Sequence, residues 1–551
     1  MVKIDRRSVI ASGCFGFGAL AFGPRAFAAE LLTATGFTHN VASGEPGQTS
    51  MLLWSRFVPA SRGDATVSVE LSTSPDFAQI AAAGQMTTGP WRDHTVKIVV
   101  DGLRPGTRYH YRFIGPDGSI SPIGRTRTLP QGRVPHFTIG IFSCSNLGFG
   151  YFNAYGHAVA AGQLDLAVHL GDYIYEYRRG GYDRTGFARV ADIQPSHEAI
   201  TLADYRLRYA SYRLDPDLQA LHQNVPMIIA PDDHEVANDI WEGGAENHQA
   251  DEGDWPTRRA AALQAWHEWL PVGESGWQRY EIGTLASYIK TDGRMFQRSR
   301  AYHMGGIVHA GSDGAPVTAA SREAALQQFR DGAWRDPAMS MLGSEQEIWL
   351  QQALTASVRA GQKWQLVGSG TVMGRQIMPA QSADWLNPQT PTWVRDSSAN
   401  NIAAARLGLP YNLDNWGGYP AARRRLLLGA EQAGANLIVV AGDSHNGWAH
   451  ELIEDGRRIG VEFGGQSVTS SGMEGATRGV DPEVVARAFA DASEELVWAD
   501  VSHRGYMRLT LTPAQAFNQW MFVDDVTVRS ANATIGKTLA VRHGRPILHT
   551  L

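Results

Sequence analysis

Hydrophobic and polar residues follow two different patterns along the chain. In the first part they alternate in short runs, such as 66–71, 95–100 and 107–113, and turn residues separate these runs. Alternation of this kind predicts half-buried β-strands. We therefore expect an all-β module over residues 30–132.

From residue 133 onward, continuous hydrophobic runs are mixed with helical periodicity. Buried strands are expected at 136–142, 164–170, 225–230, 364–367 and 437–441. Helices are expected at 257–269, 344–359 and 419–433, and further strands at 457–463, 505–512 and 516–523. The order indicates an α/β fold in which two stacked sheets carry helices on their outer faces.

Three local features give sharper expectations. Ser344 precedes Glu347 by three residues, which predicts a capping box at the start of a helix. The polar stretch 380–415 predicts a long surface loop. The three arginines at 423–425 predict a solvated helix face.

Composition limits the possible classes of function. The chain has 551 residues, of which 43% are hydrophobic and 19% charged, with a formal net charge of −6. This composition argues against disorder, and the acidic balance argues against a nucleic-acid-binding module. Beyond the N-terminus, no hydrophobic run approaches the roughly 18 residues that a transmembrane helix needs. We expect two or more domains, or one domain with large insertions, and no membrane span in the mature chain.

The N-terminus has the pattern of an export signal. Arg6 and Arg7 precede a hydrophobic stretch, and Ala-Phe-Ala at 26–28 provides a cleavage site with small residues. This arrangement predicts a twin-arginine signal peptide over residues 1–28. The export machinery is then a partner, and the mature protein would be periplasmic or secreted.

Removal of that signal leaves one cysteine. Cys14 departs with the signal peptide and Cys144 remains, so no intrachain disulfide can form. A lone cysteine is either an inert buried side chain or a metal-bound thiolate. The neighbours of Cys144 favour the second interpretation.

Four of the predicted strands end in polar clusters. The clusters are Ser-Cys-Ser-Asn at 143–146, Gly-Asp-Tyr-Ile-Tyr at 171–175, Pro-Asp-Asp-His-Glu at 231–235 and Gly-Asp-Ser-His-Asn at 442–446. Each alone is common in turns. Together they bring thiolate, carboxylate, phenolate and imidazole donors to strand ends, where ligand sites form in α/β folds. These donors suit a metal centre.

The order Cys, GDxxY, DDHE and GDxH resembles the PhoD-type alkaline phosphatases, which are calcineurin-like metallophosphoesterases. Residues 341–346, 417–420 and 467–470 extend the resemblance, which covers most of 30–525. It implies a fibronectin-III-like sandwich over 30–132, followed by a metallophosphoesterase α/β/β/α sandwich over 133–530. We expect a monomer.

The resemblance implies an iron site. Cys144 would bind Fe³⁺ as a thiolate and Tyr175 as a phenolate. His445 would bind the same ion through its imidazole. Asp172 would bridge this ion to a second metal.

The second site implied by the resemblance holds Ca²⁺ or another divalent ion. Asp233 and Asp443 would bind it, and His234 would act as the catalytic residue that faces the phosphate. The segment 290–294 matches the acidic-Thr-Arg signature of the family only loosely, so Arg294 is left out of the expected site.

These residues predict an alkaline phosphatase that hydrolyses phosphomonoesters, phosphodiesters or both with a metal-activated water. A carboxylate can hold two ions roughly 3.5–4 Å apart, and such a pair requires no protein nucleophile.

Two other functions remain open at this point. Ser444 could be the nucleophile of a serine esterase, although Asn446 breaks the GxSxG pattern. Alternatively, the chain could be a non-catalytic periplasmic binding protein that keeps its metals as structural clips. His234 has no obvious duty in such a clip, which argues against this alternative.

The twin-arginine interpretation is tested by replacing Arg6 and Arg7 with lysine. The precursor should then accumulate in the cytoplasm, because the export machinery recognises the arginine pair. Immunoblots of cell fractions measure this distribution. Unchanged export of the double variant would reject this route.

Overall fold

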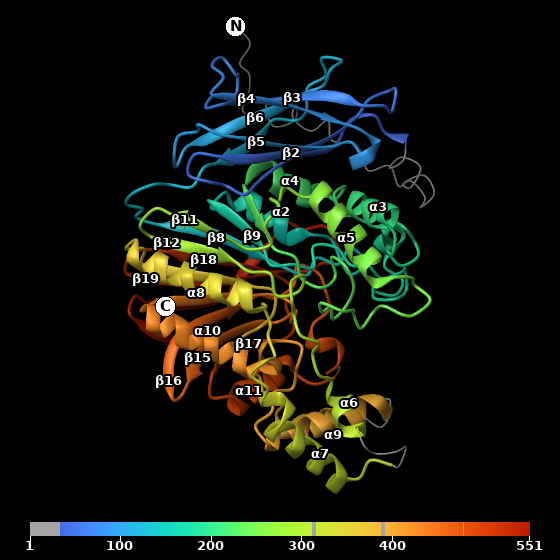
Figure 1. Ribbon diagram of the computed structural model, residues 1–551, viewed down its shortest axis with the longest axis vertical. Coiled ribbons are helices and arrows are strands. Elements are labelled where there is room, and N and C mark those ends of the chain that lie inside the picture. Colours follow the sequence, from blue (N-terminus) through green and yellow to red (C-terminus); the bar gives the residue numbers. More distant parts are fainter. Residues whose placement is uncertain (1–32, 311–315, 387–391, 478) are drawn as a thin grey trace.

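The computed structural model describes residues 33–310, 316–386, 392–477 and 479–551. A β-sandwich lies at one end of the molecule, a layered α/β body forms the middle, and a cluster of helices lies at the other end (Figure 1). The expected signal peptide falls outside the described residues. Within them, no helix combines the length and the apolar character needed to cross a membrane.

The N-terminal module is a sandwich of two sheets, as predicted. One sheet has the order β4-β3-β6-β7, and β1, β2 and β5 form the facing layer. Alternate residues of β6 are buried, including Tyr111 and Phe113, which pack against Val67 and Val69 of β3. The strands are β1 (Gly36–Gly44), β2 (Met51–Val58), β3 (Ala65–Ser72), β4 (Ala82–Thr88), β5 (Thr95–Val100), β6 (Arg108–Ile114) and β7 (Gly124–Arg127).

The sandwich is continuous with the first sheet of the body. That sheet has ten strands in the order β21-β20-β19-β18-β8-β9-β10-β1-β2-β5, and β1 joins β10 in parallel where Gly44 lies opposite Met227. Beyond residue 530, where the expected catalytic domain ends, β20 and β21 extend the same sheet. Its other strands are β8 (Phe137–Phe142), β9 (Leu166–His169), β10 (Met227–Ile229), β18 (Gly505–Leu511), β19 (Gln515–Val523), β20 (Ala533–Arg542) and β21 (Arg545–Thr550).

A second sheet of seven strands faces the first. Its order is β11-β12-β13-β14-β16-β15-β17, and β12, β13, β14 and β16 run parallel. One hydrophobic cluster joins the two sheets, with Ile139 and Val168 on one side and Leu366 and Val440 on the other. The strands are β11 (Gln278–Ile282), β12 (Ala286–Lys290), β13 (Trp364–Ser369), β14 (Leu437–Ala441), β15 (Gly447–Glu454), β16 (Arg457–Gly464) and β17 (Leu496–Asp500).

Helices cover the outer faces of both sheets, which confirms the α/β fold class. The first sheet carries α2 (Asn153–Ala161), α3 (Leu202–Tyr212), α4 (Pro216–Asn224) and α5 (Trp255–Trp269). The second carries α8 (Ser344–Arg359) and α10 (Pro420–Ala433). A further helix, α11 (Pro482–Ala492), packs against β17.

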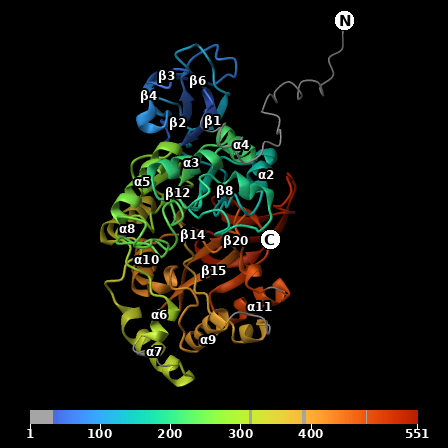
Figure 2. The same ribbon diagram turned by 90° about the vertical axis from the view of Figure 1, so that its right-hand side faces the viewer.

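The stretch 380–415 is not the expected loop. It contains a 3₁₀ helix, Ala380–Trp385, and the α-helix α9 (Thr392–Arg406). With α6 (Met304–His309) and α7 (Ala319–Asp331), α9 forms the cluster farthest from the sandwich (Figure 2). Ala404 and Leu409 pack there against hydrophobic residues more than 70 positions earlier in the chain. Because the partners are so distant in sequence, local periodicity did not reveal this helix.

The expected capping box at Ser344 is wrong. The cap position of α8 is Gly343, at φ 75°, and Ser344 is already the first helical residue. The side chain of Glu347 is engaged elsewhere, since it accepts a hydrogen bond from Ser340 at 2.6 Å and pairs with Arg425 at 2.7 Å. Tertiary contacts therefore displace the local cap.

The expected solvated face at 423–425 is also wrong in part. Arg423 is buried, and its guanidinium pairs with Glu495 at 2.7 Å. Arg424 and Arg425 remain half-exposed. A buried charge of this kind is stable only with its partner, which comes from a segment 72 residues away.

The junction between sandwich and body has no room for a side chain at Gly44. A Cβ atom there would overlap the Pro271 carbonyl oxygen and lie 3.1 Å from the Met227 carbonyl oxygen. Gly44→Ala should cost about 1–3 kcal/mol of stability and lower the Tm, because the backbone must shift. Gly305→Ala is the control, since no atom lies within 4 Å of its added Cβ. Equal Tm values of Gly44→Ala and Gly305→Ala in thermal denaturation would contradict this account of the junction.

Candidate metal centre

The four polar clusters predicted at strand ends meet where the two sheets come together. Cys144 follows β8, Asp172 follows β9, Asp233 follows β10 and Asp443 follows β14. Backbone hydrogen bonds connect the loops: the Cys144 amide donates to the Gly171 carbonyl at 3.2 Å. The ends of strands from both sheets thus bring together donors from distant parts of the sequence.

The backbone is strained at four of the predicted ligands. Cys144, Asp172, Asp443 and His445 have φ values of 59°, 54°, 63° and 61°. Residues other than glycine rarely adopt this left-handed region, and such conformations cluster at functional sites. The surrounding sheet and loop contacts hold these side chains in place.

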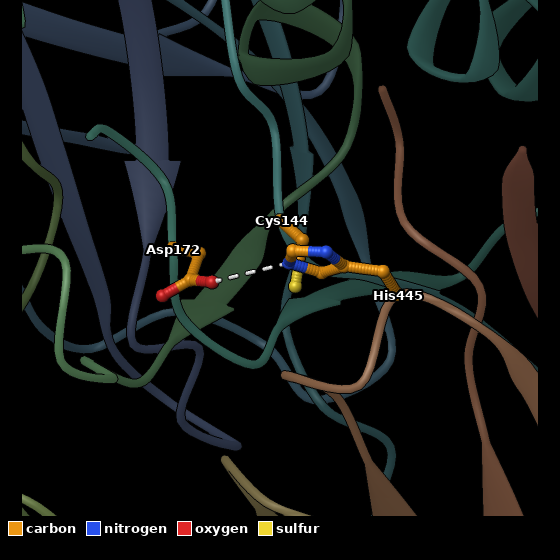
Figure 3. A group of neighbouring side chains, drawn as sticks. All are labelled: Cys144, Asp172 and His445. Atoms are coloured by element: carbon orange, nitrogen blue, oxygen red, sulfur yellow. Dashed lines mark ion pairs between the residues drawn. The ribbon is translucent and has the colours of Figure 1, made fainter. Parts of the chain in front are cut away.

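One group of donors contains Cys144, Asp172 and His445, whose ligand atoms all lie within 4.8 Å of one another. Figure 3 shows the three side chains converging, with His445 Nε2 3.9 Å from Asp172 Oδ2. The Tyr175 hydroxyl lies 3.0 Å from Asp172 Oδ2 and 3.2 Å from His445 Nε2. The nitrogen His445 Nδ1 lies 2.7 Å from the Ser471 carbonyl oxygen. A proton on Nδ1 would satisfy that carbonyl and leave the Nε2 lone pair for a metal.

Two further groups overlap with the first. Asp232, Asp233 and Asp443 form one, and Asp172, Asp233 and His234 form the other, each within the same 4.8 Å limit. Asp172 therefore belongs to both the thiolate-containing group and a carboxylate-rich group. This is the position that a bridging ligand would occupy.

The centre concentrates negative charge in a buried place. Burial, and then neighbouring carboxylates, raise the pKa values of Asp172 and Asp443 well above their usual range. Burial, followed by the carboxylate of Asp172, also raises the pKa of the Cys144 thiol. The Asp172 Oδ1 atom is buried and has no hydrogen-bond partner. Cations would favour the ionised forms and give that oxygen a partner, so the donor set fits metal ions.

Arg294 lies in the centre, although it is not among the site residues predicted from the sequence. Its side chain is fully buried, 2.7 Å from Asp232 and 3.4 Å from Asp443. It also pairs with Asp414 at 2.6 Å. The sequence of segment 290–294 already pointed to Arg294. It matches the acidic-Thr-Arg signature of the family only loosely, so Arg294 was left out of the predicted site.

His234 is held by Glu176, a carboxylate that was not predicted as a site residue from the sequence. Glu176 Oε2 lies 2.8 Å from His234 Nδ1, and both side chains are buried. Burial alone would lower the pKa of His234. The carboxylates of Asp233 and Glu176 outweigh burial and raise this pKa well above its usual value. Glu176 also accepts hydrogen bonds from the Asn247 side chain and the Asn238 amide. Its position directly after Tyr175 in the GDxxY cluster was the available signal.

Glu235 and Asp232 have different roles. Glu235 accepts hydrogen bonds from the backbone amides of Asp172, Tyr173 and Asp232, so it orders two of the loops. Asp232 forms an ion pair with Arg294 and also belongs to the group that contains Asp233 and Asp443.

The geometry around Ser444 does not support a serine nucleophile. Its hydroxyl oxygen accepts a hydrogen bond from Trp448 Nε1 at 2.7 Å. Among the described residues, no histidine or carboxylate bonds to it. A nucleophilic serine requires a partnered base.

Comparison with known proteins agrees with this architecture. The PhoD-like phosphatase family matches residues 138–520, and its N-terminal domain matches residues 25–130. Alkaline phosphatase D of Bacillus subtilis (strain 168) is 33% identical over 504 residues, which cover 87% of this chain and 76% of that protein.

Solved structures extend the comparison. A structure of PhoD superposes with a TM-score of 0.75 at 28% identity and covers 94% of this chain and 92% of its own. A purple acid phosphatase from yellow lupin (Lupinus luteus) seeds shares the fold, with a TM-score of 0.54 at 12% identity over 92% of this chain and 74% of its own. The chain belongs to the PhoD-like phosphatases, which are metal-dependent phosphoesterases.

Proposed function

We propose that this protein is an exported alkaline phosphatase that hydrolyses phosphomonoesters, phosphodiesters or both by direct attack of water. The observation that carries the proposal is the place of Asp172 in two overlapping groups of ligand atoms. A carboxylate shared in this way can hold two cations close together. Phosphoryl transfer needs such concentrated positive charge near the transferring group.

Each metal is assigned its own donors. Cys144, Tyr175 and His445 would hold ferric iron, because thiolate, phenolate and imidazole together suit that ion. Asp233 and Asp443 would hold calcium or another hard divalent ion, with Asp172 between the two. When bound, the metals supply the Lewis acidity that activates water and polarises the phosphoryl group.

Two further polar residues have roles that do not involve binding a metal: His234 faces the substrate and Arg294 positions carboxylates. His234, fixed by Glu176 through Nδ1, keeps its Nε2 for the phosphoryl oxygen or the leaving group. The tyrosine ring of Tyr175 packs against His234, with centroids 4.2 Å apart, and restricts its orientation. Arg294 holds Asp232 and Asp443 in place against their mutual repulsion.

Export and oligomeric state complete the proposal. The twin-arginine pattern at Arg6 and Arg7 supports transport of a folded, metal-loaded protein to the periplasm or the exterior. We propose that the mature protein acts as a monomer. A purely structural metal clip is less suitable, because the buried Glu176–His234 pair is not needed to hold an ion.

The reaction type is tested by comparing Asp172 with Ser444. Asp172→Asn should lose metal and lower kcat/KM by more than about 100-fold, because the shared carboxylate is gone. Ser444→Ala should keep most of its activity, since its hydroxyl only accepts a bond from Trp448. Assays of phosphoester hydrolysis give kcat/KM for both variants, and metal analysis gives their metal content. A phosphoserine trapped at residue 444 would overturn the mechanism.

The iron assignment is tested by colour. Thiolate and phenolate donors should each give a charge-transfer band with Fe³⁺, so natively exported protein should be coloured. Tyr175→Phe should shift or weaken the visible band, and Cys144→Ala should weaken iron retention. Tyr182→Phe is the matched control, because its hydroxyl lies 3.4 Å from His445 Nδ1 and is not assigned as a ligand.

A colourless, fully active enzyme without iron would reject both Cys144 and Tyr175 as ligands. An inert Cys144 would also be recognised, since Cys144→Ala would then leave iron content and colour intact. The carboxylates and His445 would in that case form a simpler divalent-metal site.

A further inference from the structure

The Glu176 carboxylate uses its two oxygens for different partners. Oε2 lies 2.8 Å from His234 Nδ1, and Oε1 accepts hydrogen bonds from the Asn247 side chain at 2.7 Å and the Asn238 amide at 2.9 Å. The side chain of Glu176 is fully buried. Rotation of this carboxylate would break at least one of the three contacts, and a buried group that loses a hydrogen bond is costly. The partners of Oε1 therefore help to fix where Oε2 meets the histidine.

Both partners of Oε1 belong to one closed loop. The Asn238 carbonyl accepts hydrogen bonds from the amides of Glu246 at 3.0 Å and Asn247 at 3.3 Å. Asn238 Nδ2 also donates to Glu246 Oε2 at 2.8 Å. These bonds close residues 238–247 into a loop that begins shortly after His234 in the sequence. Asn238 and Asn247 thus reach Glu176 as one unit.

The side chain of Asn247 bridges two carboxylates. Its Nδ2 atom donates to Glu176 Oε1 at 2.7 Å and to Glu198 Oε1 at 3.2 Å. An amide nitrogen carries two hydrogens, so one can serve each carboxylate. Removal of this amide would take a donor from both acidic side chains at once.

Arg258, on α5, holds the loop and the second carboxylate. Its side chain is buried, with 1% of its surface exposed. The guanidinium donates to Glu198 at 2.8 Å, to Glu252 at 2.8 Å and to the Asn247 carbonyl at 3.0 Å. Arg258 therefore fixes the backbone of Asn247 and compensates the charge of Glu198.

A second path leads from Arg258 to the backbone beside His234. Arg258 Nε donates to the Tyr205 hydroxyl at 3.1 Å, and that hydroxyl donates to the Val236 carbonyl at 2.6 Å. The Val236 amide donates to the Asp233 carbonyl at 2.8 Å, which closes a turn around His234. One buried arginine thus supports His234 through its side-chain partner and through its own turn.

Arg258 does not contact the substrate itself. Each of its three guanidinium nitrogens already donates to a group of the protein. An effect of Arg258 on the reaction must therefore pass through the residues that it holds.

We infer that Asn247 and Arg258 are positioning residues for His234. Asn247 acts through the Glu176 carboxylate, and Arg258 acts by holding Asn247 and the turn that contains the histidine. This inference rests on the proposed function, in which His234 Nε2 faces the phosphoryl oxygen or the leaving group. A displaced ring would lose that contact, since a misplacement of about 1 Å can cost roughly 100-fold in rate.

Kinetics of the natively exported, metal-loaded enzyme test the role of Asn247. Asn247→Leu should lower kcat/KM for a phosphoester by about 10–100-fold while metal content stays unchanged. In a His234→Ala background, the same substitution should lower kcat/KM by less than about twofold, because the group that it positions is gone. An equal loss in both backgrounds would overturn the inference, since Asn247 would then act on the fold or on the metals.

Arg258 is tested against a matched buried arginine. Arg258→Met should lower kcat/KM, and Arg258→Lys, which keeps a positive charge beside Glu198, should recover part of the loss. Arg423→Met is the control, because it removes a buried arginine that pairs with Glu495 from α10. It should lower the Tm and keep kcat/KM at a temperature where both variants are folded. Equal losses of kcat/KM in Arg258→Met and Arg423→Met would overturn the role of Arg258.

Crystal structures of the variants give a readout that does not depend on activity. In Asn247→Leu the Glu176–His234 contact should lengthen or the histidine ring should rotate, and in Arg423→Met both should stay unchanged. A His234 ring in its original place in Asn247→Leu would overturn the inference. If His234→Ala left hydrolysis unchanged, the proposed role of His234 would fail, whereas a displaced ring in Asn247→Leu would still support the positioning contacts.

Discussion

The structure depends on the cost of gathering buried negative charge where its two sheets come together. Asp172, Asp232, Asp233 and Asp443 come together there with a thiol, and Arg294 is the buried arginine that faces them. Arg294 and a protonated His234 together supply two positive charges against these four carboxylates. Burial, and then the neighbouring carboxylates, raise the pKa values of Asp172 and Asp443, so bound cations would stabilise the ionised centre.

The two stacked sheets and their connections hold that arrangement in place. Strands of both sheets end close together, and four of the residues in the loops that follow them have positive φ values. Arg294 precedes α6 and Asp414 follows α9, so their ion pair ties both ends of the segment that contains this helical cluster to the centre. The sandwich joins the same sheet through β1 and β10.

Much of this could be predicted from the sequence, for identifiable reasons. Hydrophobic runs marked the core strands within a few residues, since a buried strand leaves a continuous signal. All six expected ligands and His234 converge in the structure, because their clusters directly follow those strands. The helix α9, the partner of Arg423 and the Glu176–His234 contact could not be predicted in this way, since each depends on residues far apart in the sequence. The capping box at Ser344 failed for a related reason, as Glu347 is engaged by Arg425.

The central claim is that Asp172 lies between two metal ions. Anomalous X-ray diffraction from crystals of the natively exported, active enzyme tests it most directly. The account predicts two peaks roughly 3.5–4 Å apart on either side of the Asp172 carboxylate. The peak beside Cys144 should respond to the iron absorption edge. A single peak, or none, in crystals that still hydrolyse a phosphoester would contradict the account.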